Sequence, residues 1–382
     1  MRTAYRPFPL GIAVLCLIIA GAPSLAAQRG AAVPAASAPA SATARIVAAA
    51  QAVVAALDEA GRAKVQFPFE GPQKSRWSNL PSGIFQRDGI RLTDLTAPQT
   101  AAVMHLLEVA LSADGYRKVT EIMQGDEVLK GQSGGGRQTA PPTQAPAAQA
   151  APPTPGGQGQ GRGGRGGRGG GPIFGAGEYW LAFVGVPSVT TPWMLQFGGH
   201  HLAINLTMAG AHSSMTPSLP AAQPAKYSIE GREIRPLGRE NDKGFALVNA
   251  LDATQKSKAI LNYKVSDLVL GATQDGKVIA PEGLLASELT PAQQTMLLDL
   301  VREWAGIVND AFSAPRMAEI RANLPRTYFA WSGPTTNGDV AYFRIQGPTL
   351  VIEYAPQGSV DHIHTIYRDP TNDYGAKFAA AK

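Results

Sequence analysis

The sequence predicts an α+β fold made of two tandem, pseudo-symmetric units, each with helices and an antiparallel sheet. The first observation behind this prediction is a repeat without gaps at an offset of 194 residues. Residues 54–58 resemble residues 248–252, and residues 94–99 fall on residues 288–293. Because the offset stays constant over both stretches, chance similarity between two helix starts is a poor explanation.

A second repeat follows at a different offset. The segment Gly199-His200-His201 with residues 202–205 resembles residues 347–353, at an offset of 148. The offset drops by about the length of a Gly/Arg-rich stretch that only the first copy carries. The sequence therefore indicates one insertion, placed inside the first copy.

Local signals assign the elements within each unit. Thr96 and Thr290 can each cap a helix through the side-chain hydroxyl, and Pro98 and Pro291 fit the first turn. Apolar residues then recur at helical spacing. Residues 342–346 alternate in the period of two that is typical of a strand with one buried face.

Residues 1–27 read as a signal peptide. Arg2 and Arg6 precede a short apolar run at residues 10–20, and Ser24-Leu25-Ala26 offers a cleavage pattern of small residues. The apolar run is too short for a membrane anchor. We therefore expect an exported protein, periplasmic or secreted, with no transmembrane segment after signal cleavage.

The remaining chain divides into a tether and two units. Residues 28–43 are rich in Ala, Pro and Ser and are predicted as a low-complexity tether. The first α+β unit is predicted at 44–225 and the second at 226–382. Residues 131–172 contain Gly, Pro and Arg-Gly-Gly repeats with little apolar surface, which predicts a disordered insertion.

Composition limits the chemistry. The single cysteine, Cys16, lies in the predicted signal, so a metal site in the mature chain must use nitrogen and oxygen ligands. The net charge of +5 includes two signal arginines and four in the insertion, and without these six the net charge is −1. A near-neutral folded part gives no reason to expect a nucleic-acid partner.

The histidines give the strongest functional signal. His362-Ile363-His364 has the spacing that places two imidazoles on one side of an extended segment, where both reach the same ion. His201 belongs to the first copy and is expected to face the same space. The sequence thus predicts a divalent metal ion, zinc first, with iron, copper or manganese as alternatives.

Other polar residues are assigned supporting roles. Glu353 is expected to ligate the metal or act as general base, and Arg368 to hold an anionic group of the substrate. The candidates for contact with the ligands or the substrate are His200, Asn205, Asp361 and Asp369. A hydrogen-bonded histidine cluster without metal is the alternative interpretation.

One further segment joins cations to an indole. Lys74-Ser75-Arg76-Trp77-Ser78-Asn79 follows the first helix of the first unit. It is expected either to line a substrate cleft or to pack at its rim.

Several of these motifs together resemble a known family. The Gly199-His200-His201 segment, Glu353-Tyr354 and the His362-Ile363-His364 segment with Arg368-Asp369 are similar to domain-of-unknown-function family 3500. The resemblance covers nearly the whole mature chain and implies that these segments form one recurring site. The family pattern has Asp-Asn after the Glu-Tyr and Asn before the His-x-His, where this chain has Ala355-Pro356 and Asp361.

The leading functional hypothesis is an exported metal-dependent hydrolase acting on a small anionic or polar substrate. The same ligands suit an iron or copper oxidoreductase, and a non-catalytic protein that binds a metal or small ligand is a third reading. The sequence does not separate these three.

Overall fold

The computed structural model describes residues 39–134 and 171–379. The predicted signal and most of the predicted tether and insertion lie outside these ranges. Helix α1 begins at Pro39, so residues 39–43 are helical and not part of a tether. Ala42 and Thr43 are buried there, and alanine has the highest helix propensity, which explains the early start. Helix α4 likewise continues to Gly134, four residues into the range predicted as the insertion.

The structure has a mixed α+β fold, as the sequence predicts. The first half contains these elements in order: α1 (Pro39–Ala56), α2 (Glu59–Val65), β1 (Gln66–Phe67), η1 (Pro72–Ser75), β2 (Ile90–Arg91), η2 (Leu92–Asp94), α3 (Ala97–Ala110), α4 (Ala113–Gly134), β3 (Trp180–Val184), β4 (Trp193–Gly199), β5 (Leu202–Ala209), β6 (His212–Ser214) and β7 (Leu219–Pro220).

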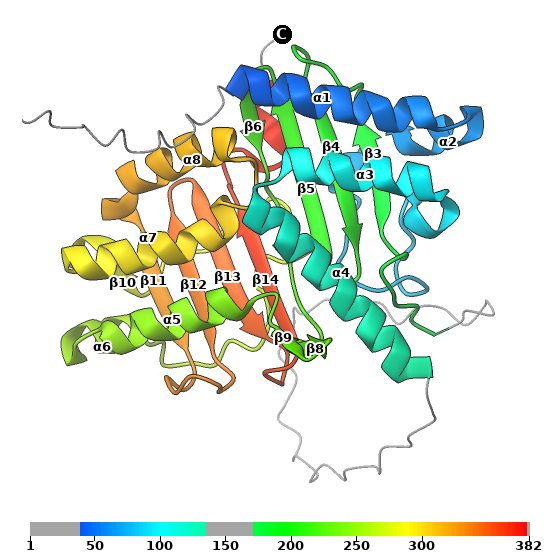
Figure 1. The fold of residues 1–382 in the computed structure, drawn as a ribbon. Helices are drawn as coiled ribbons and strands as arrows, with labels where there is room; N and C mark the ends of the chain where they lie inside the picture. The colour runs from blue at the N-terminus through cyan, green and yellow to red at the C-terminus, as the bar shows by residue number, and fades with distance from the viewer. Residues whose placement is uncertain (1–38, 135–170, 380–382) are drawn as a thin grey trace, which may run out of the picture. The chain divides into compact units, whose positions relative to one another are not determined.

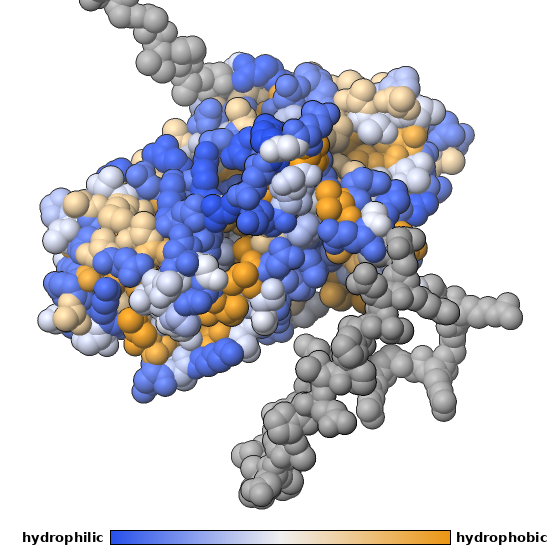
Figure 2. All heavy atoms as spheres, turned by 60° about the horizontal axis from the view of Figure 1, so that its bottom comes forward, coloured by the Kyte–Doolittle hydropathy of each residue, from blue (hydrophilic) through white to orange (hydrophobic). Residues whose placement is uncertain are grey.

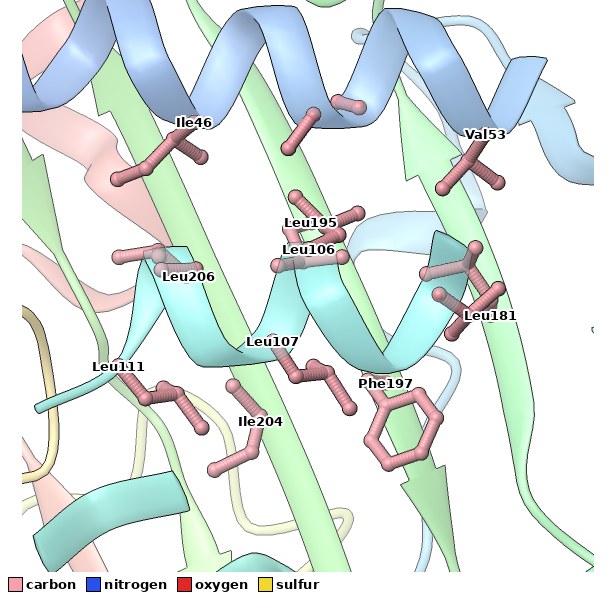
Figure 3. Close-up of a cluster of buried hydrophobic side chains, with 14 of the residues drawn as sticks. Ile46, Val53, Leu106, Leu107, Leu111, Leu181, Leu195, Phe197, Ile204 and Leu206 are labelled. Carbon is pink, nitrogen blue, oxygen red and sulfur yellow. The ribbon is translucent and has the colours of Figure 1, made fainter. Parts of the chain in front are cut away.

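Helices cover one face of the first sheet. The strands are ordered β1-β3-β4-β5-β6, with β2 added to β3 and β7 added to β5. Helices α1 and α3 lie over this sheet (Figure 1). Figure 3 shows Ile46 of α1 and Leu107 of α3 above Phe197 and Ile204 of the strands, and all four are fully buried. Burying such side chains supplies about 1.5–3 kcal/mol each.

The second half has its own sheet, in the order β10-β11-β12-β13-β14. Its elements are β8 (Tyr227–Ile229), β9 (Arg232–Ile234), α5 (Gly238–Ala250), α6 (Ala253–Ala259), β10 (Leu284–Leu285), η3 (Ala286–Glu288), α7 (Pro291–Ala305), α8 (Asp310–Ala322), η4 (Leu324–Arg326), β11 (Tyr328–Ser332), β12 (Tyr342–Gly347), β13 (Leu350–Pro356), β14 (Ile363–Arg368), η5 (Asp373–Gly375) and α9 (Ala376–Ala379). Helices α5, α7 and α8 lie over one face of this sheet (Figure 1).

The predicted helix starts are confirmed at α3 and α7. Thr96 and Thr290 are the N-cap residues, and a proline occupies the first turn of each helix. The Thr96 amide donates to the Gln99 side chain, and the Thr290 amide donates to the Gln293 side chain. In α7 the Gln293 amide also donates to the Thr290 hydroxyl (3.3 Å). These contacts satisfy amides that no helical carbonyl can reach.

Equivalent strands within each of the two sheets pair in the same register. Ile90 pairs with Leu181 between β2 and β3, and Leu284 pairs with Phe329 between β10 and β11. The first members of these pairs differ by 194 and the second members by 148, the two offsets of the sequence repeat. The register agrees with the repeat, while a tandem duplication as its origin stays a prediction.

Residues 218–222 run between the two sheets. Leu219 in β7 pairs with Ala203 of β5. On the other side, Ser218 bridges Tyr367 and Ala222 bridges Ile363 of β14. This segment therefore brings the β4–β5 hairpin of the first half next to the start of β14 in the second.

Among the described residues, α1 alone is long and apolar enough to cross a membrane by length and composition. Its apolar side packs on the first sheet, with Ile46 and Val53 buried, so the core accounts for its composition. On the face shown in Figure 2, hydrophilic residues predominate in the middle, and apolar residues gather in smaller groups around them.

Candidate metal centre

The β4–β5 hairpin positions His201. Gly199 pairs with Leu202, which leaves His200 and His201 as a two-residue turn. His201 has a φ of 59°, a left-handed conformation that non-glycine residues seldom adopt. Backbone contacts hold it there, because its amide donates to the Asn79 carbonyl (3.0 Å) and its carbonyl accepts from the Ala221 amide (2.8 Å).

A close approach beside this turn requires glycine. A Cβ on Gly199 would lie 2.6 Å from the Tyr179 ring and 2.8 Å from the Glu178 carbonyl oxygen. The ring packs there because the Tyr179 hydroxyl donates to the His200 carbonyl (2.9 Å). Gly199 therefore lets the turn sit tightly against the preceding strand.

Strand β14 positions the other two histidines. Ile363 and Thr365 face the helices, and Thr365 accepts a hydrogen bond from Trp304 of α7. Because side chains alternate along a strand, His364 points to the opposite face, and His362 precedes the strand on that same side. His201 is buried, whereas His362 and His364 are half-buried.

The three imidazoles meet through their Nε2 atoms. His362 Nε2 lies 3.0 Å from His201 Nε2 and 3.0 Å from His364 Nε2. The potential ligand atoms of all three residues lie within 4.8 Å of one another. Zinc–nitrogen bonds of about 2.0–2.1 Å at tetrahedral angles place ligand nitrogens about 3.3 Å apart. The observed separations fit such a set with little adjustment.

Hydrogen bonding alone accounts poorly for this cluster. A ring nitrogen of a neutral imidazole carries either a proton or a lone pair, so it is a donor or an acceptor. His362 Nε2 contacts two ring nitrogens, and in either state it must share one proton or one lone pair between them. Three lone pairs directed at one ion resolve the conflict. The three residues therefore form a group that could hold a metal ion.

Burial favours the neutral form of His201 and His362. Desolvation lowers the pKa of His201 well below the usual value, and the neighbouring histidines lower it further. Desolvation also lowers the pKa of His362 to about 4, with a further contribution from His364 and His200. Only the neutral ring offers a lone pair to a metal, so these shifts favour the form that binds.

His200, expected near the ligands, lies directly behind His201. Its ring centroid is 3.7 Å from that of His201, and Nδ1 lies 2.5 Å from Asp126 Oδ1 on α4. Phe174 contacts its other side. Burial raises the pKa of Asp126, while the contact with His200 opposes the rise. His200 thus supports the ring of His201 from a fixed position.

Two residues that the sequence did not single out as metal-site residues flank the centre. Asn79 Nδ2 lies 3.3 Å from His364 Nε2. Asp267 Oδ1 lies 3.8 Å from His364 Nδ1, and it accepts a hydrogen bond from Gln357 (2.6 Å). Asp267 is the carboxylate nearest to the three ligands among the described residues. Both residues come from irregular loops, where no periodic pattern marks them.

Glu353 lies under a loop of the second half. Its carboxylate is fully buried and accepts hydrogen bonds from the amides of Val269 and Leu270 and from the Tyr342 hydroxyl (2.6 Å). It is absent from the ligand group formed by the three histidines. Residues 265–275 cover the outer face of the second sheet. Amides of this loop donate to the carboxylate oxygens of Glu353. Glu353 therefore holds this loop, and these contacts give no support to a role as ligand or general base.

Arg368 contacts the same loop. Its guanidinium donates to the carbonyls of Leu270 (2.7 Å) and Gly271 (2.9 Å). Nη1 also pairs with Asp275 (2.9 Å) and Asp373 (2.8 Å). The side chain is nearly fully buried. Two carboxylates and two carbonyls occupy four of its five N–H donors, so the anion-holding role has no support from these contacts and stays a prediction.

The other predicted neighbours lie apart from the ligands. Asn205 donates to the Pro217 carbonyl (2.8 Å) and accepts from Gln196 (3.0 Å). Asp361 is exposed and accepts from the Ala225 amide (3.1 Å). Asp369 pairs with Arg316 (3.2 Å). Each makes a local backbone or ion-pair contact, and none forms a hydrogen bond or ion pair with His201, His362 or His364 among the described residues.

The comparisons with known proteins identify the family. A family model described as "Protein of unknown function (DUF3500)" matches residues 39–376. The chain belongs to this family. No curated protein and no solved structure matches the chain. The DUF3500 match spans both halves and thus all three histidines.

One departure from the expected family pattern lies at the centre. Ala355 pairs with His364 across β13 and β14, and Pro356 pairs with Ile363. An aspartate at position 355 would lie beside a ligating imidazole. This chain has a buried methyl group there, so the described loops supply the nearby polar groups instead.

Proposed function

We propose that this DUF3500 protein binds one divalent metal ion, zinc first, through His201, His362 and His364. The mutual approach of the three Nε2 atoms carries this proposal. Three neutral imidazoles without thiolate suit zinc and also iron, copper or manganese. Asn79 and Asp267 border the ligand set and would hold water or substrate next to it.

We further propose that the centre serves metal-dependent hydrolysis of a small molecule. Three protein ligands leave a coordination position for water, as in catalytic zinc sites. A bound metal lowers the pKa of that water to near neutrality and polarises a carbonyl or phosphoryl oxygen. The partial exposure of His362 and His364 supports access from solvent. Asp267 is the carboxylate best placed to accept a proton or to orient His364.

Metal analysis of the protein purified without a histidine tag tests the binding step. We expect close to one metal ion per chain, and loss of this metal in the double variant His362→Ala/His364→Ala. The matched control is His105→Ala, because His105 is exposed on α3 and contacts Glu108. Equal metal content in the double variant and the control would remove the proposal.

A hydrolysis assay tests the second step. The protein is screened against small esters, amides and phosphate esters, first with bound metal and then after treatment with a chelator. We expect activity that the chelator abolishes and added zinc restores. Cobalt substitution adds a separate reading, because its visible spectrum changes when an added anion takes an open coordination position.

One observation favours a second candidate function, a non-catalytic metal-binding protein. Glu353 and Arg368, the expected general base and substrate anchor, are both used to hold residues 265–275. A bound metal whose cobalt spectrum does not respond to added anions, combined with no chelator-sensitive hydrolysis, would favour this second function.

We also propose export and an origin by duplication. Export rests on the signal pattern in residues 1–27 and on a remaining chain without cysteine. Duplication is supported by the matching strand registers at offsets of 194 and 148. Cell fractionation with N-terminal sequencing of the mature protein tests export: a mature chain that still begins at Met1 would contradict it.

A further inference from the structure

A buried guanidinium without a counter-anion lies next to the β4–β5 turn. Arg87 is 7% exposed. Its Nη2 donates to the carbonyls of Ser78 (2.7 Å), Leu80 (2.6 Å) and Gly199 (2.7 Å). Its Nη1 is buried and has no hydrogen-bond partner among the described residues. Burying a charge without a counter-charge is costly, so buried charges are normally paired.

Among the described residues, no carboxylate forms an ion pair with Arg87. The two carboxylates whose charge raises the pKa of Arg87 are paired with other residues, Asp126 with His200 and Glu178 with Arg91. The residues outside the described ranges contain no aspartate or glutamate. An acidic side chain from those segments therefore cannot supply the missing charge. Desolvation lowers the pKa of Arg87 to about 10, against smaller opposing contributions from Tyr179, Asp126 and Glu178.

Arg87 lines a small pocket that opens to solvent. Its walls are mostly apolar, and include the aromatic residues Trp77 and Trp180 and the small residue Ala182. At the mouth, Arg76 Nε pairs with Asp88 (2.5 Å), and both side chains are more than 40% exposed. Because this pair is neutral overall, Arg87 gives the cavity its net positive charge.

The guanidinium is held rigidly by aromatic rings. Its Cζ lies 5.4 Å from the centroid of Phe85 and 5.6 Å from that of Trp180. With three carbonyls on one nitrogen, the side chain cannot turn away toward solvent. A planar guanidinium fixed in this way recognises a planar carboxylate better than a point charge would. The surrounding apolar walls fit a short hydrocarbon group attached to it.

We propose that this cavity binds a small carboxylate, with its charge on Arg87 and its apolar part against Trp77 and Trp180. The site adjoins the candidate metal centre through the chain: Ser78 precedes Asn79, which contacts His364, and Gly199 precedes the His200-His201 turn. Binding of the carboxylate does not depend on the metal. If the hydrolase function also holds, the site assigns carboxylate-bearing molecules as the substrate class.

Calorimetric titration of the full chain with propionate tests the proposal, at constant ionic strength. Propionamide, a neutral molecule of nearly the same shape, is the matched ligand. We expect saturable binding of one propionate per chain, and binding of propionamide that is weaker by about tenfold or more, because the charge-assisted contact is lost. Equal affinity for the two ligands would overturn the proposal, and so would tighter binding of inorganic phosphate than of propionate.

Two variants locate the site. Arg87→Gln is expected to weaken propionate binding by about tenfold or more. Arg91→Gln is the matched control, because Arg91 lies 5.8 Å from the same Trp180 ring but pairs with Asp94 and Glu178. Its affinity is expected to stay within about twofold of the unchanged chain. Similar losses in both variants would contradict the assignment.

Arg87 also holds three carbonyls, so Arg87→Gln can lose its fold. A second variant, Ala182→Val, adds volume to a strand residue that lines the cavity and leaves the guanidinium in place. It is expected to weaken propionate binding by about fivefold or more, and unchanged affinity would place the ligand elsewhere. The His362→Ala/His364→Ala variant should bind propionate normally, which separates this test from that of the metal centre.

Discussion

The two halves place different chemistry at the same position of their sheets. In the first sheet, Gln196 pairs with Asn205 across β4 and β5. In the second, Arg344 pairs with Glu353 across β12 and β13. Both pairs lie on the sheet face that the helices do not cover. One half therefore carries two neutral amides where the other carries two ionisable groups.

Both pairs hold a long loop on the sheet. Gln196 exchanges hydrogen bonds with Gln73, which lies in the loop after α2. Glu353 accepts from Val269 and Leu270, in the loop after α6. The first loop leads to Asn79 and the second carries Asp267, the two polar residues that flank the histidines. The comparison teaches that each half presents one loop residue to a shared centre. In the second half a carboxylate, Glu353, holds the loop, whereas in the first half a neutral amide, Gln196, does so.

The largest expected effect concerns the ligands themselves, which the halves supply unequally. His362→Ala/His364→Ala removes two ligands of the second half and should abolish metal binding at micromolar metal. His201→Ala removes the single ligand of the first half and should weaken affinity by about 100-fold or more, since loss of even an outer partner costs about 10–100-fold. Competition with a chelating dye measures both constants. Equal affinities of the His201 variant and the unchanged chain would assign the centre to the second half alone.

Next in size is the difference between the two anchors. Glu353→Ala leaves buried amides, the Tyr342 hydroxyl and Arg344 without this carboxylate, and should lower the free energy of unfolding by about 3–5 kcal/mol. Asn205→Ala removes neutral hydrogen bonds and should cost about 1–3 kcal/mol. Urea unfolding measures both values. Trypsin cleavage at Lys264 or Lys277 should also increase in the Glu353→Ala variant. Equal losses of stability in Glu353→Ala and Asn205→Ala would contradict the difference between the halves.

A smaller effect distinguishes the flanking residues. Asp267→Asn removes the carboxylate next to His364 and should weaken metal affinity by about tenfold, at the lower end for an outer partner. Asn79→Ala removes a neutral amide and should weaken it by only about twofold to threefold. Asp339→Asn, which alters an exposed carboxylate, is the control for net charge. If Asp339→Asn weakens metal affinity as much as Asp267→Asn does, the loss comes from the change in net charge and not from the position of Asp267.

A separate effect is a pH dependence of the metal-free protein. The pKa of His362 is about 4 in the folded chain and about 6.5 in an unfolded one. Between these values the unfolded state binds the extra proton, so the free energy of unfolding decreases as pH falls from about 6.5 to 4. His362→Ala lacks this contribution and should show a shallower decrease. Urea unfolding at several pH values compares the two, and parallel curves would contradict the shift.

Much of the fold could be predicted because it follows local and repeated patterns. The hydroxyl caps at Thr96 and Thr290 depend on neighbouring residues, and the strand registers follow the two offsets. The grouping of three histidines was also accessible, since alternation along β14 places His362 and His364 on one side. The caps and the alternation depend on spacing within a short segment, and the registers depend on the internal repeat.

The rest of the site could not be predicted from such spacing. Glu353 lies on the expected strand face, but residues 265–275 cover that face and take up its carboxylate. A loop that packs on a sheet has no periodic sequence pattern by which it could be predicted. The contact of His200 with Asp126 joins residues 74 positions apart on different elements, and Asp267 reaches His364 from a loop. Such partners are selected by tertiary packing.

The His201–His362 contact joins side chains 161 positions apart in the chain. An ion held there would act as a removable cross-link between the two halves, favouring the folded state in proportion to the logarithm of the free metal concentration above the dissociation constant. Neither half, expressed alone, would contain the complete ligand set. Metal supply could then govern how long the protein survives heat or proteases in its surroundings, apart from any reaction that it catalyses.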